Sequence, residues 1–403
     1  MRRNTYCGGV HRRRLVLILQ VAVGLLAAGY GVMFTMLDDW RDKYGIQETG
    51  LGFIVAVGFF TSFIAQLTLA PLADKGLARK MLTIGFALNV VGALGMAFGT
   101  NLPAFILGRT LMGIGTGIAI PATRRIIIVS DRDNVGRNLG RGVSIEVGGF
   151  ALGPMISALT VDAFGLAAPF LIMAALILVA SVVIARANVP ETPPEDQTTE
   201  RFAFDLLRIR PLVGAILIGL ALYVMIGVFD PLWVVMMDDM GASSWVGNAG
   251  VSLFGLPWIL FGTLGGKIAE RHGPFRVSAF GLLAGAVYML FYASLESPYV
   301  LLAVALTHSA LDAFTVTGTG IAVSQSVPEE RQAGASGLLG GMQTLTGGIA
   351  AMLAGVIYEH LGRRAAFGIT SVTITVLVIS GIAIAGWSVL RSPASRDARV
   401  AAQ

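Results

Sequence analysis

Twelve long apolar stretches dominate this 403-residue sequence. A helix needs about 20 apolar residues to cross a hydrocarbon layer of about 30 Å, and each stretch has roughly that length. The stretches cover residues 15–36, 50–70, 81–99, 102–122, 142–160, 166–185, 211–235, 248–266, 277–295, 299–320, 334–356 and 365–389. Their apolar character is continuous, whereas strands of a membrane barrel alternate over about ten residues, so we expect helices.

The composition supports a membrane protein independently of these stretches. Hydrophobic residues make up 55% of the chain and charged residues only 13%, against about 25% charged residues in soluble domains. The sequence therefore predicts an all-α membrane protein with twelve transmembrane helices.

A short segment occurs twice and divides the chain into two halves. Ala70–Lys75 recurs in altered form as Gly266–Arg271, and each copy lies between two apolar stretches. With the same offset, Tyr44–Gln47 aligns with Met240–Ser243. We therefore expect two pseudo-symmetric six-helix bundles.

Basic residues indicate the orientation of the chain. Of 29 Lys and Arg residues, 24 lie in the tails or in the loops that follow even-numbered spans. The exceptions are Arg41, Lys43, Arg109, Arg363 and Arg364. Cytoplasmic loops are enriched in Lys and Arg, so both termini are predicted to be cytoplasmic in a multi-pass protein of the plasma (inner) membrane. The basic balance then reflects topology and contact with anionic lipids, and nucleic acid is not an expected partner.

One long polar segment separates the two halves. It contains Pro190, Pro193 and Pro194 among several acidic residues, a composition typical of a linker. The predicted organisation is a cytoplasmic tail (1–14), an N-terminal bundle (15–186), a cytoplasmic linker (187–210), a C-terminal bundle (211–390) and a second cytoplasmic tail (391–403). Two bundles of this kind are the plan of a secondary transporter.

Both copies of the repeated segment resemble a loop motif of the major facilitator superfamily, Gly-x-Leu-Ala-Asp-Arg-x-Gly-Arg-Lys. The first copy matches it with Asp74, Lys75, Arg79 and Lys80. Ala70 replaces the leading Gly there, and the basic pair is displaced by one residue. The second copy matches it with Gly266, Glu270, Arg271 and Gly273. In that copy Glu replaces Asp, and Pro274 replaces the first closing basic residue.

An acid beside basic residues at a helix junction can bind a helix end in one conformation and release it in another. We therefore expect Asp74 and Arg79 to hold the cytoplasmic side closed. The alternative is an ordinary positively charged loop with a helix cap.

Two further motifs lie in the fourth and fifth spans. Arg109, Met112, Gly113 and Gly115 are similar to Arg-x-x-Gln-Gly-x-Gly of the same superfamily, with Met in place of Gln. The spacing of the fifth-helix antiporter motif is reproduced by Gly140, Gly149, Gly153 and Pro154. Ser157-Ala158 replaces the closing Gly-Gly of that motif. The chain thus resembles the drug:proton antiporter branch over almost its whole length, which implies alternating access and a functional monomer.

The glycines of the fifth span also have a physical interpretation. Gly149, Gly153 and Pro154 remove side chains and one backbone donor, which permits close helix approach and a bend. In exporters of this superfamily, such packing is thought to limit leakage through the bundle. The alternative is a packing groove with no bearing on the direction of transport.

Ionisable residues inside the spans are candidates for coupling, because a charge in hydrocarbon is costly unless it faces a cavity or a partner. Arg109 is expected to face the central cavity. His308 and Asp312 are four residues apart and share a helix face. Burial disfavours an ionised carboxylate, so this pair suits proton binding. The alternative is a hydrogen-bonded pair that fixes helix packing.

Glu146 lies about one turn from the cytoplasmic end of its span, with Arg124, Arg125 or Arg141 as nearer partners than Arg109. It is a candidate for proton coupling or for a cytoplasmic gate. Three further acids lie near the outer ends of spans: Asp38, Asp39 and Asp230. They are candidates for a role in substrate entry or exit, and the alternative is that they are simply solvated residues at helix ends. Possible cavity-lining residues are Gln66, Asn89, Asp230, Gln343 and Thr344. Polar side chains of this kind also join helices to one another.

The leading hypothesis is a secondary active transporter that exports small amphipathic molecules, drugs or metabolites, by proton-coupled alternating access. The alternatives are a proton-coupled importer of a sugar, organic acid or other metabolite, and a non-transporting receptor or scaffold. An enzyme is not expected, because the four histidines, at 11, 272, 308 and 360, are scattered and form no metal cluster. We predict no cofactor, no metal, and H+ as the coupling ion.

Overall fold

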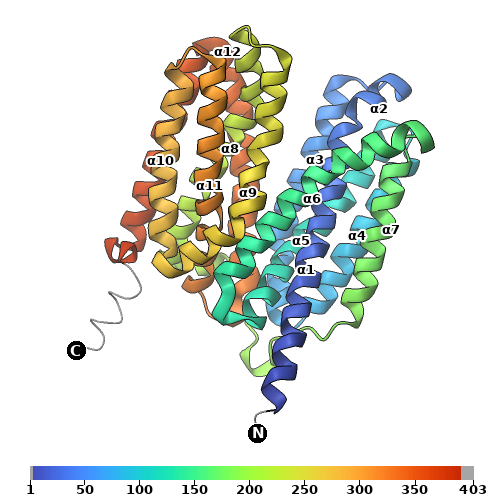
Figure 1. Ribbon diagram of the computed structural model, residues 1–403. Coiled ribbons are helices and arrows are strands. Elements are labelled where there is room, and N and C mark those ends of the chain that lie inside the picture. Colours follow the sequence, from blue (N-terminus) through green and yellow to red (C-terminus); the bar gives the residue numbers. More distant parts are fainter. Residues whose placement is uncertain (1–2, 392–403) are drawn as a thin grey trace. The chain divides into compact units, whose positions relative to one another are not determined.

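The computed structural model describes residues 3–391. The side chains of residues 3–11, 38, 48, 244, 245, 248, 249, 251 and 252 also lie outside the description. All regular structure in the described residues is helical (Figure 1). The helices are α1 (Arg3–Thr35), α2 (Leu37–Tyr44), α3 (Glu48–Thr68), α4 (Ala78–Phe98), α5 (Leu102–Ser130), α6 (Val135–Phe164), α7 (Ala168–Arg186), α8 (Arg210–Asp239), α9 (Ser244–His272), α10 (Pro274–Ser294), α11 (Pro298–Ser326) and α12 (Gln332–Ala385).

Ten helices of the described chain are long and apolar enough to cross a membrane. One of them, α12, contains two helices that meet at the non-helical Gly362. Helix α9 is also long, with 29 residues, although several of its side chains are not described. The twelve long helices expected from the apolar stretches are therefore present, and the short α2 is an addition.

Several helices extend beyond the apolar stretches that predicted them. Helix α5 ends at Ser130 rather than near residue 122, and α6 begins at Val135 rather than near residue 142. Apolar length reports only the part of a helix that needs a hydrocarbon environment, whereas backbone hydrogen bonding continues through polar residues such as Arg125. The predicted ends at these positions were wrong for this reason.

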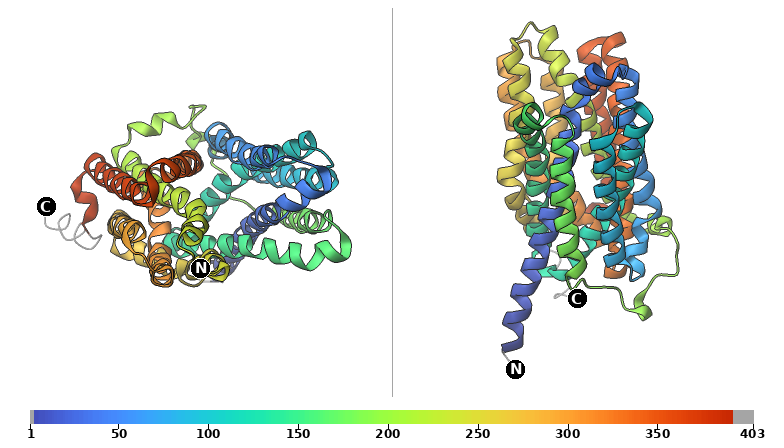
Figure 2. Two further views of the ribbon diagram at one scale, coloured as in Figure 1. Left: turned by 90° about the horizontal axis from the view of Figure 1, so that it is seen from above. Right: turned by 90° about the vertical axis from the view of Figure 1, so that its right-hand side faces the viewer.

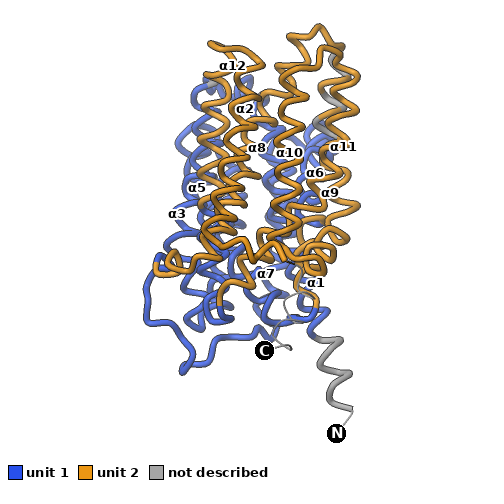
Figure 3. The backbone as a smooth tube through the Cα atoms, turned by 90° about the vertical axis from the view of Figure 1, so that its left-hand side faces the viewer, with its two compact units in different colours: residues 1–133, 145–204, 328–341 blue, residues 134–144, 205–327, 342–403 orange. Residues whose placement is uncertain are grey.

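The chain forms two compact units (Figure 3). Unit 1 comprises residues 1–133, 145–204 and 328–341, and unit 2 comprises residues 134–144, 205–327 and 342–403. In unit 1, α4 packs on α5 and α7, and α3 packs on α5. In unit 2, α11 packs on α8, α9 and α10. Seen from above, most of the helices are foreshortened, and a green helix runs across the view (Figure 2).

Each unit also takes a short segment from the other half of the sequence. The start of α12 belongs to unit 1 and the start of α6 belongs to unit 2. Many large apolar side chains point outward, as along α7 at Leu176, Val179 and Val183. Surfaces of this kind suit hydrocarbon rather than water.

Candidate functional site

The central pair of unit 2 lies on α11. His308 and Asp312 are both fully buried, and the imidazole Nε2 lies 3.6 Å from the carboxylate Oδ2. Neither oxygen of Asp312 has a hydrogen-bond partner among the described residues. The described residues also provide no Lys or Arg within ion-pair distance of this carboxylate. Asp312 is therefore a buried acid whose nearest titratable neighbour is an imidazole.

Aromatic side chains surround this pair. The Tyr292 hydroxyl, on α10, lies 3.0 Å from His308 Nδ1, and the Tyr288 ring stacks on the imidazole with centroids 4.6 Å apart. The rings of Phe229 and Phe254 meet the imidazole edge-on. Tyr292 is thus hydrogen-bonded to His308, and His308 lies 3.6 Å from Asp312, inside an apolar shell. An imidazole beside a buried acid is an arrangement that can hold a proton.

In unit 1, Arg109 is fully buried on α5. Its guanidinium carbon lies 3.8 Å from the centre of the Tyr30 ring on α1. None of its three side-chain nitrogens has a hydrogen-bond partner among the described residues. The backbone of Gly58, on α3, lies so close that a β-carbon there would overlap the guanidinium. Arg109 is therefore a buried cation that lies on the face of the Tyr30 ring, in space that the absent side chain of Gly58 leaves open.

Glu146, on α6, lies in unit 1 and is partly exposed. Among its expected basic partners, Arg124 lies close enough for its charge to act on the Glu146 carboxylate. Arg125, a second partner expected for Glu146, instead forms an ion pair with Asp74. Glu146 and Arg109 are not joined by an ion pair in the described residues.

Asp74 lies in the short 3-10 helix η1 (Ala70–Lys75) and is fully buried. Its two oxygens accept hydrogen bonds of 2.9 and 2.7 Å from the backbone N–H groups of Ala333 and Gly334. These residues form the first turn of α12, where N–H groups lack partners within the helix and the helix dipole favours an anion. Arg125 Nε lies 3.3 Å from Asp74 Oδ1. Asp74 thus caps α12, although the capped residues lie about 260 positions later in the sequence.

The basic residues of the same motif contact the linker instead. Arg79 donates to the carbonyl of Ala187, and Lys75 Nζ lies 3.4 Å from the carbonyl of Thr199. The Glu191 carboxylate accepts hydrogen bonds of 2.9 and 2.8 Å from the N–H groups of Ala78 and Arg79, at the start of α4. Lys80 is exposed. Arg79 therefore anchors the linker, whereas Asp74 holds α12.

The second copy of the motif ends α9 in unit 2. Gly136, in the first turn of α6, lies close to this copy of the motif. A β-carbon added at Gly136 would be 2.8 Å from Glu270 Oε2. Glu270 thus lies beside the first turn of α6, as Asp74 lies beside that of α12. Gly266 also contacts Gly136, Arg271 is exposed, and Gly273 has a φ of 99°, which favours glycine between α9 and α10.

The glycines of α6 fall into two groups. In unit 1, Gly149 lies against Gly24 of α1, and a β-carbon at Gly153 would be 2.6 Å from the Ala28 carbonyl. In unit 2, Gly140 lies against Gly262 of α9. Pro154 lies inside α6, and the Oγ atoms of Ser157 and Thr35 are 2.8 Å apart. These small residues allow backbone-to-backbone contact between helices.

Three of the possible cavity-lining residues are buried and join secondary-structure elements. Gln343 donates to the Gly219 carbonyl at 3.2 Å, and Asn89 accepts from Thr116 at 3.2 Å. Gln66 lies against Gly340 at the start of α12. The exceptions are Asp230, which is exposed, and Thr344, which is partly exposed. Asp39 lies on α2 and is partly exposed, and the side chain of Asp38 lies outside the described residues.

The sequence reasoning missed Tyr30, Gly58, Glu191 and Tyr292 as partners of these residues. Tyr288 and Tyr292 could have been singled out, because they are hydroxyl-bearing residues four apart within an apolar span. The other three partners have no signal in a single sequence.

We expect Asp74→Asn to insert normally and to slow transport roughly tenfold, because an amide offers one acceptor and leaves a buried N–H of α12 without its partner, at about 1–3 kcal/mol. Loss of the charge also leaves Arg125 without its carboxylate partner. The measurement is the initial transport rate in proteoliposomes at matched protein content. Asp133→Asn, which alters an exposed acid of unit 1, is the control. A normal rate for Asp74→Asn would exclude a gating role.

The long apolar helices and the charged residues buried among them define a multi-pass membrane transporter. The sequence profile of the Major Facilitator Superfamily matches residues 19–247 and 215–402. The chain belongs to the major facilitator superfamily, and the predicted fold of twelve transmembrane helices in two bundles is confirmed.

Known relatives are similar over much of the chain. Multidrug resistance protein MdtG of Proteus mirabilis is 23% identical over 289 residues, which cover 68% of this chain and 71% of that protein. Quinolone resistance protein NorA of Staphylococcus aureus is 28% identical over 142 residues, 35% of this chain and 37% of that protein.

Solved structures show the same fold. The human organic anion transporter MFSD10 superposes with a TM-score of 0.76 at 16% identity, covering 92% of this chain and 99% of that one. The proton:xylose symporter XylE superposes with a TM-score of 0.75 at 15% identity, covering 96% and 97%.

Proposed function

We propose that this transporter exports small amphipathic molecules, drugs or metabolites, in exchange for protons. The observation that carries proton coupling is the buried Asp312, which has an imidazole beside it and no Lys or Arg partner in the described chain. An ionised carboxylate in such surroundings is costly, and a proton removes that cost. Access from alternate sides of the membrane would load and release this proton.

Two observations support the export direction. The relatives described above are named for drug and quinolone resistance. In addition, Gly149 and Gly153 bring α6 into backbone contact with α1, as expected for a tightly sealed bundle. Arg109 and Glu146 are proposed to assist coupling, and Asp74, with Glu270 in the second copy, to hold the predicted cytoplasmic gate.

A proton-coupled importer of a sugar, organic acid or other metabolite is the second candidate. One observation favours it, because Ser157 replaces a glycine of the antiporter motif and its hydroxyl is used in a polar contact with Thr35. The fold itself is shared with a proton:xylose symporter and does not separate the two directions.

The test is substrate flux in proteoliposomes with a proton gradient of either sign. The screen includes amphipathic cations, quinolones and sugars such as xylose, with protein-free liposomes and a proton ionophore as controls. Movement of an amphipathic compound opposite to the proton flow supports the proposal. Uphill movement in the same direction as protons would establish the importer, and absence of any flux would favour a receptor or scaffold.

We further propose that the protein works as a monomer in the plasma membrane, with both termini in the cytoplasm and H+ as the coupling ion. The positive loops support this orientation. The predicted tails, bundles and linker are part of the same proposal.

A further inference from the structure

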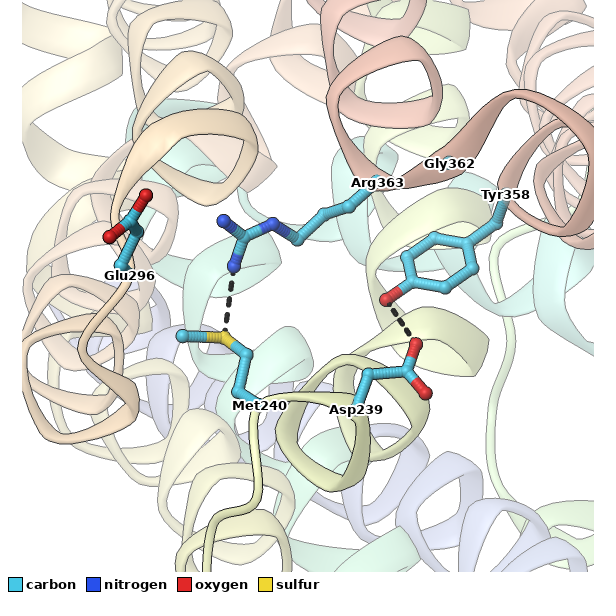
Figure 4. A pocket seen from close by; sticks show the side chains of 6 residues that line it. All are labelled: Asp239, Met240, Glu296, Tyr358, Gly362 and Arg363. Carbon is cyan, nitrogen blue, oxygen red and sulfur yellow. Dashed lines mark hydrogen bonds between the residues drawn. The ribbon is translucent and has the colours of Figure 1, made fainter.

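A depression of about 410 Å³ lies in unit 2, and neither His308 nor Asp312 lines it. Its lining residues are Asp239, Met240, Glu296, Tyr358, Gly362 and Arg363 (Figure 4). The volume is in the range of small-molecule sites, which begins at about 300 Å³. None of these residues belongs to the motifs or to the proposed proton pathway.

Three parts of the chain build the depression. Asp239 is the last residue of α8, Glu296 lies between α10 and α11, and Arg363 follows the kink of α12. Gly362 has a φ of 79°, a conformation that favours glycine, and it turns the chain so that Tyr358 and Arg363 both border the depression. Arg363 is also one of the few basic residues predicted to lie outside the cytoplasm.

The charged groups of the depression are not matched with one another. Tyr358 donates a 2.8 Å hydrogen bond to Asp239 Oδ2. The guanidinium of Arg363 contacts the Met240 sulfur, at 2.9 Å, and a thioether is a weak acceptor. No ion pair joins Arg363 to Asp239 or Glu296 in the described chain. Glu296 is exposed, and its carboxylate lies across the depression from Arg363 without such a pair.

We propose that this depression binds a small zwitterion, a molecule with an ammonium group and a carboxylate separated by a short spacer. The ligand's carboxylate binds Arg363 in a fork geometry, and its ammonium group binds Glu296. Asp239 stays with Tyr358, which donates a hydrogen bond to it (Figure 4). A simple anion meets two carboxylates here, and a simple cation meets Arg363, so only a dipolar ligand satisfies both ends.

Binding at this site does not require the proposed proton-coupled transport. The test therefore measures binding rather than flux, so its failure leaves the export proposal untouched. The full chain in lipid nanodiscs is titrated calorimetrically with glycine, β-alanine, γ-aminobutyrate and ε-aminocaproate, which differ in spacer length. Butylamine and butyrate serve as single-charge analogues of γ-aminobutyrate. We expect one spacer length to bind best, and both single-charge analogues to bind about tenfold more weakly.

Two variants test the assignment of the charges. Arg363→Gln should remove the preference for the zwitterion over butylamine, and Glu296→Gln should remove its preference over butyrate. Each should weaken binding of the best zwitterion about tenfold. Arg364→Gln and Glu359→Gln change exposed neighbours that do not line the depression and should bind as the unmodified chain does.

Three results would overturn the proposal. The first is that no member of the amino acid series binds, and the second is that single-charge analogues bind as well as zwitterions. The third is that the Arg363 and Glu296 variants bind as tightly as their controls.

Discussion

Asp312→Asn should abolish accumulation of substrate against its gradient and leave downhill exchange intact. Asn keeps the size of Asp and imitates its protonated form, so the substrate pathway persists while the residue can no longer release a proton. With membrane potential clamped, one coupled proton and a gradient of about one pH unit provide about 1.4 kcal/mol, or tenfold accumulation at most. The variant should reach only equal concentrations on both sides, measured with labelled substrate in proteoliposomes.

Substitutions of the residues around Asp312 should have smaller effects than Asp312→Asn. His308→Ala removes the imidazole at 3.6 Å, and we expect a milder loss with a displaced pH optimum. Tyr292→Phe removes only the hydroxyl beside His308 Nδ1 and separates this contact from ring packing. Asp162→Asn alters an exposed acid of α6 and is the control.

If Asp312→Asn still drives uphill transport at the unmodified level, the residue is a packing element. The coupling acid would then be sought at Glu146, Asp38, Asp39 or Asp230.

The fold was largely predictable because the bilayer limits what an apolar run can become. Continuous stretches of about 20 residues leave a helix as the solution, and the repeated loop indicates two halves. Helix ends were less predictable, since α5 continues through Arg124 and Arg125 to Ser130. The polar character of those residues ends the apolar run without ending the helix.

The candidate site was predictable only along one helix at a time. Periodicity placed His308 and Asp312 on one face of α11, because four residues make about one turn. Contacts between helices have no such rule. The hydroxyl of Tyr292 comes from another helix, and the partners of Asp74 are backbone N–H groups of Ala333 and Gly334, which no side-chain pattern reveals.

The linker illustrates the same limit. Its prolines and acids predicted a solvated connection, yet Thr192 is buried and Glu191 caps α4. Arg125 joins these features, because its guanidinium contacts Asp74 on one side and donates to the Pro190 carbonyl on the other. A residue that serves two distant segments cannot be recognised from its neighbours in the sequence.

Arg109→Lys should reduce transport about tenfold or more, although it preserves the charge. The planar guanidinium lies on the Tyr30 ring at 3.8 Å, and a cation–π contact of this kind is worth about 2 kcal/mol when desolvated. An ammonium group is compact and strongly hydrated, so it does not reproduce the flat contact and is costlier to bury. The measurement is initial flux in proteoliposomes, with Arg186→Lys, at the exposed end of α7, as the control.

Two neighbours of Arg109 distinguish a role in transport from a role in folding. Tyr30→Phe keeps the ring face and should retain flux, whereas Tyr30→Leu removes it and should behave like Arg109→Lys. Gly58→Ala places a β-carbon against the guanidinium and should displace it without altering any charge. Unimpaired flux in Arg109→Ala would show that the residue is peripheral. If flux and yield of folded protein fall together in every variant, the buried guanidinium holds α1, α3 and α5 together, and the charge that responds to substrate lies elsewhere.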